Sequence, residues 1–177
     1  MVQLDDPFSS MSKETKKLAD RLSVRRGKLQ GVYKTLLHHP DLTERVSGLG
    51  DLLRFEGVLS LRQKEVVILA TARGVSSRFV WQQHESIARK VGTPEETIEA
   101  IRSETPPNDP LDLVFVEVAN SVVAGTALSE AIHNRVCTYV GVAGCVEAVT
   151  IAGFYKMINA LVISFEVPLP RPEEPSF

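Results

Sequence analysis

The amino-acid sequence predicts an all-α fold, a bundle of about seven or eight helices. Along most of the chain, apolar residues recur at the spacing of three or four that is typical of amphipathic helices. Glycine and proline fall where these patterns end, and the sequence contains no Asn-Gly or Asp-Gly hairpin turn. No run alternates strictly between apolar and polar side chains, so no segment is predicted as a β-strand.

The composition indicates an ordinary globular protein whose 177 residues can bury a substantial core. Hydrophobic residues make up 44% and charged residues 24%, and the net charge is -2. This balance argues against a nucleic-acid or membrane partner. The first residues lack the basic and apolar regions of a signal peptide, so we expect a cytoplasmic protein. We expect a flexible segment over residues 1–12 and one domain over 13–167. A proline-rich tail over 168–177 is expected to leave the body as an extended arm.

Three helices are predicted before the centre of the chain. A basic helix over residues 13–23 is interpreted as a solvated face, because no aromatic side chains lie between its charges. A short helix over residues 27–39 ends before Pro40. The third helix begins with Asp41 as its N-cap and ends at Gly57, a residue type that favours helix C-termini.

Further helices are predicted after the centre. Residues 93–96 read as a capping box that opens a short helix, and Asp109 and Pro110 begin another. A helix over residues 128–139 follows. Residues 140–167 form the longest apolar run, which is long enough to span a membrane. Charged and amide side chains interrupt this run, so we expect a core helix that neighbours, including those of another subunit, cover on several sides.

Residues 57–92 read as a helix, a turn and a second helix. Ser60 and Gln63 fit a capping box at the start of the first helix. Glu65 follows within its first turns, just before a continuous apolar stretch. The second helix carries an apolar stripe at helical spacing, and its one histidine, His84, lies on that stripe. Both ionisable side chains are therefore expected to face inward.

Glu65 and His84 form the candidate catalytic pair. A carboxylate that accepts a hydrogen bond from one imidazole nitrogen fixes the tautomer and raises the basicity of the other nitrogen. Such a pair is suited to moving a proton near pH 7. The alternative is a buried hydrogen bond that only ties the two helices together.

Two residues on the second helix are candidates for the pocket wall. Ser77 lies on the stripe of His84, but seven residues of helix span about 10 Å. That distance excludes direct proton transfer, so Ser77 either binds substrate or caps the helix. Trp81 lies one turn from His84 and either lines the pocket or fills the core.

Three more residues are candidates for substrate binding. Arg73 and Arg78 flank the turn, where either can pair with a substrate carboxylate, or be exposed. Tyr155 is one of the polar residues of the apolar C-terminal run, together with Glu147 and Asn159. These groups need partners if buried, and they either line the same pocket or bridge subunits.

Cysteine and histidine spacing predicts no metal site and no cofactor. Cys137 and Cys145 lie eight residues apart and form neither a C-x-x-C motif nor a disulfide framework. His133 and Cys137 are four residues apart, as two ligands on one helix face would be, but the sequence has no second pair.

The central segment resembles the carboxymuconolactone decarboxylase-like family. The resemblance rests on E-V-V-I-L-A from Glu65, on W-Q-Q-H ending at His84 and on A-x-x-x-G over residues 88–92. It covers roughly residues 27–168 and is strongest over 57–101. The superfamily includes the alkylhydroperoxidase D type enzymes, so the resemblance implies their helical bundle, which assembles as a trimer or hexamer.

The same resemblance implies roles for four positions. Alkylhydroperoxidase D type enzymes use a glutamate, a redox cysteine pair and a histidine as a proton relay. Glu65 and His84 occupy the glutamate and histidine places, whereas Ser77 and Val80 occupy the cysteine places. The thiol mechanism of the peroxidases therefore lacks its usual groups here.

We expect an enzyme that acts on a small carboxylated or lactone-type substrate through proton transfer by Glu65 and His84. Two alternatives stay open at this stage. One is an alkylhydroperoxidase-like antioxidant that uses Cys137 or Cys145, and the other is a non-catalytic homo-oligomer that binds a small molecule.

Overall fold

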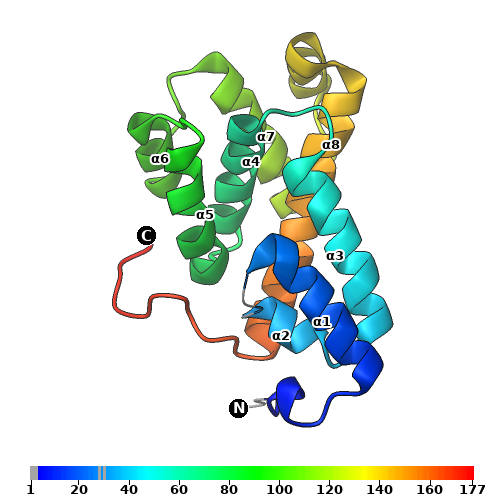
Figure 1. Ribbon diagram of the computed structural model, residues 1–177. Coiled ribbons are helices and arrows are strands. Elements are labelled where there is room, and N and C mark those ends of the chain that lie inside the picture. The colour runs from blue at the N-terminus through cyan, green and yellow to red at the C-terminus, as the bar shows by residue number, and fades with distance from the viewer. Residues whose placement is uncertain (1–3, 28, 30) are drawn as a thin grey trace.

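The computed structural model describes residues 4–27, 29 and 31–177. Within these residues the chain forms eight α-helices and one short 3-10 helix, with no strand, as the sequence predicts (Figure 1). The elements are η1 (Pro7–Ser9), α1 (Lys13–Arg26), α2 (Val32–Leu36), α3 (Pro40–Phe55), α4 (Leu61–Gly74), α5 (Arg78–Lys90), α6 (Glu95–Arg102), α7 (Pro110–Ala124) and α8 (Glu130–Ser164).

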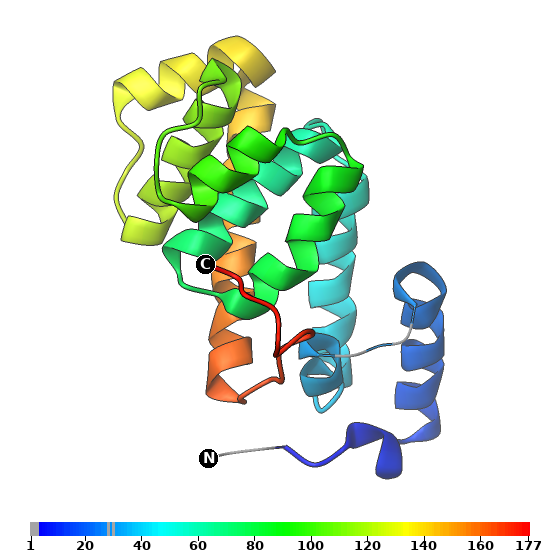
Figure 2. The same ribbon diagram turned by 90° about the vertical axis from the view of Figure 1, so that its left-hand side faces the viewer.

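Helix α4 is the centre of the bundle. It packs against α5, α7 and α8, and every residue from Lys64 to Ala72 is buried. Figure 1 shows α4 between α5 on one side and α3 and α8 on the other. A second, smaller apolar cluster joins α1 to the segment around α2, and Figure 2 shows α1 as an outer helix beside α3. This smaller cluster comprises Leu18, Ala19, Leu22, Leu29 and Leu37.

The predicted capping box at the start of α4 is confirmed. The Ser60 hydroxyl accepts a hydrogen bond from the Gln63 backbone N–H at 3.3 Å, and the Gln63 side chain accepts one from the Ser60 backbone N–H at 2.8 Å. These two bonds satisfy N–H groups that have no partner inside the helix. The start of α4 is thus set by local sequence.

Two other predicted helix starts are wrong. His39 rather than Asp41 caps α3, and its ring Nδ1 accepts a backbone N–H of the first turn at 3.3 Å. Pro40 occupies the first helical position, where its missing N–H costs nothing. Helix α6 has Pro94 as its N-cap and no side-chain cap. Thr93 does not form the predicted box, because its backbone N–H instead closes the end of α5.

The two helices predicted over residues 128–167 correspond to the two parts of α8, which meet at a residue with non-helical backbone angles. A kink at Gly141 marks the predicted boundary, and its φ of 71° is a conformation that favours glycine. Among the described helices, α8 is long and apolar enough by length and composition to cross a membrane. Its buried residues beyond the kink, such as Ile151 and Ile158, belong to the main core.

Exposed apolar residues gather on two helices. They include Leu42, Leu49, Leu52 and Phe55 of α3 and Val142, Val146 and Ile163 of α8. Large exposed apolar areas on a globular protein often mark a contact with another chain. The expected homo-oligomer, a trimer or hexamer, stays a prediction.

A buried ion pair fixes the entry to α4. Lys64 Nζ lies 3.1 Å from Glu147 Oε1 of α8, and the two side chains are 2% and 8% exposed. Glu147 Oε2 also accepts the backbone N–H groups of Val58 and Leu59, at 2.7 and 3.2 Å. Gly57 lies so close to this carboxylate that a Cβ there would collide with it. The loop before α4 is therefore tied to α8.

Replacement of Gly57 tests this contact. Gly57 and Gly92 both have positive φ, so alanine at either position should cost about 1 kcal/mol of backbone strain. Only at Gly57 would the new Cβ also displace the Glu147 carboxylate, whereas nothing lies within 4 Å at Gly92. Gly57→Ala should therefore lower the free energy of unfolding by about 1–3 kcal/mol more than Gly92→Ala. Urea denaturation of both variants measures the difference, and equal losses would contradict the contact.

Candidate functional site

The structure brings Glu65 and His84 together between α4 and α5. Nδ1 of His84 lies 2.8 Å from Oε2 of Glu65, and the two side chains are 8% and 7% exposed. An ionised carboxylate can only accept, so the imidazole donates Nδ1–H and leaves Nε2 as its second functional nitrogen. The predicted inward-facing pair is confirmed as a geometric fact.

Local sequence explains why the two helices meet in this way. Helix α4 ends at a tight turn in which Ser76 has a φ of 54°. Ser77 then caps α5, since its hydroxyl accepts the backbone N–H of Val80 at 3.4 Å. The apolar stripe of α5 faces α4, and His84 lies on this stripe. A short turn between two amphipathic helices thus places a carboxylate opposite an imidazole.

A cavity of about 480 Å³ lies beside His84. The ring of Tyr155, from α8, meets the imidazole edge-on with centroids 5.0 Å apart and an interplanar angle of 85°. The size of the cavity suits a small organic ligand. Its wall is formed by Leu29, Val32, Tyr33, Gly50, Arg54, Phe79, Val80, Gln83, His84, Ile87, Phe154, Tyr155 and Ile158.

A second cavity of about 610 Å³ adjoins the first one. Leu29, Phe79 and Gln83 line both cavities, so these three side chains stand between them. We call this second cavity the outer cavity and the one beside His84 the inner cavity. The outer cavity is lined by residues 4–8, the segment around α2 and residues 165–170. The inner cavity beside His84 is thus bordered by a larger hollow formed by segments from both ends of the chain.

Comparison with known proteins agrees with this geometry. Residues 40–110, which include Glu65 and His84, match the model of the carboxymuconolactone decarboxylase family. No curated protein matches the sequence significantly.

Three solved structures are similar in fold. A peroxidase-related protein from Silicibacter sp. TM1040 and one from Ralstonia eutropha JMP134, described as an alkylhydroperoxidase AhpD core, each have a TM-score of 0.79 and 16% identity. Each of these matches covers 94% of this chain and 91% of the other. The debrominase Bmp8, in complex with 2,3,4-tribromopyrrole, has a TM-score of 0.69 and 11% identity over 95% of this chain and 90% of its own.

Residues 40–110 thus resemble the carboxymuconolactone decarboxylase family, and the described residues have the AhpD-like helical fold. By the resemblance described for the sequence, Ser77 and Val80 stand at the two positions where the alkylhydroperoxidase D type enzymes carry cysteines. Val80 lines the cavity, whereas Ser77 is 3% exposed and caps α5. The cavity wall therefore presents the isopropyl group of Val80, rather than a thiol, beside His84.

The two cysteines of the chain lie elsewhere. Cys137 and Cys145 are both on α8, and neither belongs to the described lining of the cavity. Burial raises the pKa of the Cys145 thiol, and the neighbouring Cys137 raises it further, so its thiolate form is disfavoured. Cys137 lies 3.5 Å from Nε2 of His133 on the same helix. In the part of the chain that the structure describes, no group of three or more potential metal ligands occurs.

Several predicted binding residues lie outside the cavity. Trp81 is fully buried on another side of α5, where its ring meets the edge of Phe177 at 5.5 Å. Arg73 donates to the Arg102 carbonyl and pairs with Glu104 at 2.8 Å. Arg78 is exposed. None of these side chains, and not Ser77, belongs to the lining, whereas Tyr155 does.

Glu147 and Asn159, the two polar residues that the sequence analysis grouped with Tyr155 on α8, make contacts that hold the fold together. Glu147 pairs with Lys64, and Asn159 donates to the Val75 carbonyl at 3.4 Å. Both lie outside the described lining of the cavity. Each instead ties α8 to one end of α4, so these two residues do not follow the alternative in which they line the pocket.

Sequence analysis did not single out Arg54, Tyr33 or Gln83 as site residues. Arg54 is in the last turn of α3, Tyr33 is in α2, and both reach the cavity because their helices pack against α8. One feature of the sequence could have pointed to Gln83 as a site residue, because it directly precedes His84. The sequence carries no local pattern that separates Arg54 from Arg45 on the same helix.

The proline-rich tail folds back onto the bundle instead of leaving it as we expected. The Gln82 amide donates to the carbonyls of Arg171 and Glu174, at 2.8 and 3.0 Å. It also accepts the Arg171 backbone N–H at 3.2 Å. The returning tail places the ring of Phe177 against Trp81. The indole N–H of Trp81 donates to Glu85 at 3.1 Å.

Glu85 holds α5, α6 and the buried Trp81 together. Its carboxylate accepts hydrogen bonds from Arg102 at 2.5 Å and from Arg89 at 2.8 Å. Burial alone favours the neutral form of Glu85, but the two guanidinium groups outweigh it and hold the pKa of this carboxyl below the ordinary glutamate value.

Glu85→Gln should therefore lower the free energy of unfolding at pH 7 by about 1 kcal/mol. A lowered pKa contributes stability above the unfolded-state value of 4.5, and this contribution is lost as the pH falls below it. Chemical denaturation of the variant and the wild type between pH 3 and 7 measures the difference. Glu96→Gln, at an exposed position of α6, is the control. A pH-independent difference for Glu85→Gln would contradict the account.

Proposed function

We propose that this protein is an enzyme that transfers a proton to or from a small organic substrate bound beside His84. The observation that carries the proposal is the buried 2.8 Å contact between Glu65 and His84 at the wall of a cavity of about 480 Å³. A histidine tied to a carboxylate and open to a cavity is the arrangement of a general acid–base catalyst.

The two residues have different roles. Glu65 holds the imidazole in one orientation and stabilises the imidazolium form, because its carboxylate faces Nδ1–H. Nε2 of His84 then exchanges the proton with the substrate. Tyr155 packs on the imidazole ring and limits its rotation. The fixed geometry removes the need to orient the catalyst during the reaction.

Decarboxylation of a carboxylated or lactone-type substrate is the reaction that we propose. The bond between the carboxylate and its neighbouring carbon breaks, CO₂ leaves, and the electron pair stays on that carbon as a carbanion or enolate. The imidazolium of His84 gives the proton from Nε2 to this carbon and is reprotonated from water. This sequence needs no redox partner. The match to the carboxymuconolactone decarboxylase family supports it.

A peroxidase function is the second candidate, because two structures of similar fold are peroxidase-related proteins. Reduction of a peroxide by thiols needs a thiolate that attacks and a second thiol that resolves the product. In the described structure Cys137 and Cys145 lie outside the lining of the His84 cavity. This placement favours proton transfer over thiol chemistry. A binding protein without catalysis is the third candidate.

Turnover in D₂O separates the candidates. Incubation with a panel of carboxylated butenolides should release CO₂ and leave one deuterium on the carbon that lost the carboxylate. His84→Gln or Glu65→Gln should lower kcat by about 10²–10⁴-fold, which is the usual contribution of general acid–base catalysis. Mass spectrometry of the product and detection of CO₂ measure both effects.

Matched variants serve as controls. His133→Gln, at an exposed position of α8, should retain turnover, as should Cys137→Ser and Cys145→Ser. Circular dichroism checks that each variant keeps the wild-type helix content. Thiol-dependent turnover of an organic peroxide that is lost on replacing Cys137 or Cys145 would favour the peroxidase-like candidate. Binding of the acids without turnover by the wild type would favour the binding protein.

A further inference from the structure

Arg54 supplies the only permanent charge on the wall of the inner cavity, as far as the described residues show. The ionisable side chains of the lining are Arg54, His84 and two tyrosines, and no carboxylate belongs to it. Glu65 contacts His84 but is not part of the lining. The described wall therefore presents a guanidinium without a facing negative charge.

The other arginines that pack onto the bundle have carboxylate partners. Arg62 pairs with Asp112 at 2.7 Å, Arg73 with Glu104 at 2.8 Å, and Arg102 with Glu85 at 2.5 Å. Within the described residues, Arg54 has no carboxylate or carbonyl partner. Its guanidinium makes a cation–π contact with the ring of Phe55, with the guanidinium carbon 5.0 Å from the ring centroid. A cation–π contact does not use the in-plane N–H groups that bind anions.

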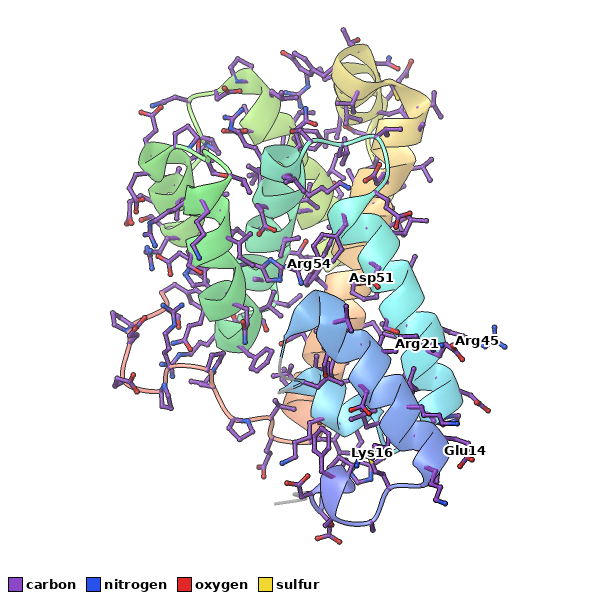
Figure 3. All side chains as sticks on the ribbon, in the orientation of Figure 1. Glu14, Lys16, Arg21, Arg45, Asp51 and Arg54 are labelled. Carbon is purple, nitrogen blue, oxygen red and sulfur yellow. The ribbon has the colours of Figure 1, made fainter. Side chains whose placement is uncertain are left out.

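The direction of the side chain supports a role in the cavity. Figure 3 shows Arg54 pointing from α3 toward the space between α3 and α5, whereas Arg45 of the same helix points outward. Arg54 is partly buried and Arg45 is exposed. A partly buried guanidinium interacts with an anion more strongly than an exposed one, because water screens the charges less.

We propose that Arg54 is the specificity-determining residue of this site, and that it selects organic acids by binding a carboxylate of the substrate. This inference rests on the proposed function and names its substrate class: small acids with an apolar body. Val32, Phe79, Ile87, Phe154 and Ile158 offer the apolar surface for that body.

The held carboxylate is a recognition group and not the reacting one. Two parallel hydrogen bonds from a guanidinium stabilise a carboxylate in the ground state, which opposes its loss as CO₂. The reacting carbon therefore lies away from Arg54, beside Nε2 of His84. The guanidinium and the imidazole belong to different helices, α3 and α5, so the substrate bridges them.

Three matched pairs of probes test the inference by calorimetry: phenylacetate, cinnamate and hexanoate, each against its primary amide. Each pair has nearly equal shape and differs in charge. At least one acid should bind the wild type about ten- to a hundredfold more tightly than its amide. Arg54→Gln should lose this preference while the affinity for the amide stays the same. Arg45→Gln is the matched control and should keep the preference.

Three results would each overturn the inference about Arg54. The inference fails if no acid binds the wild type more tightly than its amide, if Arg54→Gln keeps the preference for acids, or if Arg45→Gln loses this preference equally. A purely structural role of Arg54 would weaken acid and amide alike.

Failure of the proposed function gives a different pattern. His84→Gln should still prefer acids, because His84 is not the recognition group. If this variant also retained turnover in D₂O, the proton-transfer proposal would fail while the role of Arg54 stood.

Discussion

The hydrogen bond between Glu65 and His84 is the interaction on which the account of this protein depends. Both side chains are almost fully buried, and burying either one alone would be costly. The pair is sustained because α4 is fixed on its other side as well. Lys64, the residue before Glu65, is held by Glu147 of α8. Lys64 and Glu65 are thus consecutive charged residues of α4 with separate partners. The pair of Lys64 and Glu147 anchors the helix, whereas Glu65 orients the imidazole of His84.

The chemistry of the site follows from what surrounds this pair. Val80 lines the cavity with His84, and Ser77 caps α5, at the two positions that by resemblance would hold the cysteines of a peroxidase. Without thiols, the acid–base pair keeps its geometry but has no redox partner beside it. Proton transfer is the chemistry that such a pair can perform by itself. Arg54, whose guanidinium is the one permanent charge among the described lining residues, is the group that we propose to hold an acid in place.

Much of the fold could be predicted because it is encoded locally. The capping box of Ser60 and Gln63 and the apolar stripe that carries His84 are short-range patterns, and the structure confirms them. The cavity wall could not be predicted in the same way. Sequence proximity favoured Arg73 and Arg78, whereas Arg54 reaches the site through the packing of α3. Trp81 turned out to face the tail, whose return depends on long-range contacts with Gln82.

The tautomer of His84 is the most direct test of the central claim. Long-range ¹H–¹⁵N correlation spectra of protein labelled at histidine report which ring nitrogen carries the proton. The account predicts that neutral His84 carries it on Nδ1, facing Glu65, with Nε2 unprotonated, and that Glu65→Gln removes this preference. A proton on Nε2 of His84 in the wild type, or a spectrum unchanged in Glu65→Gln, would contradict it.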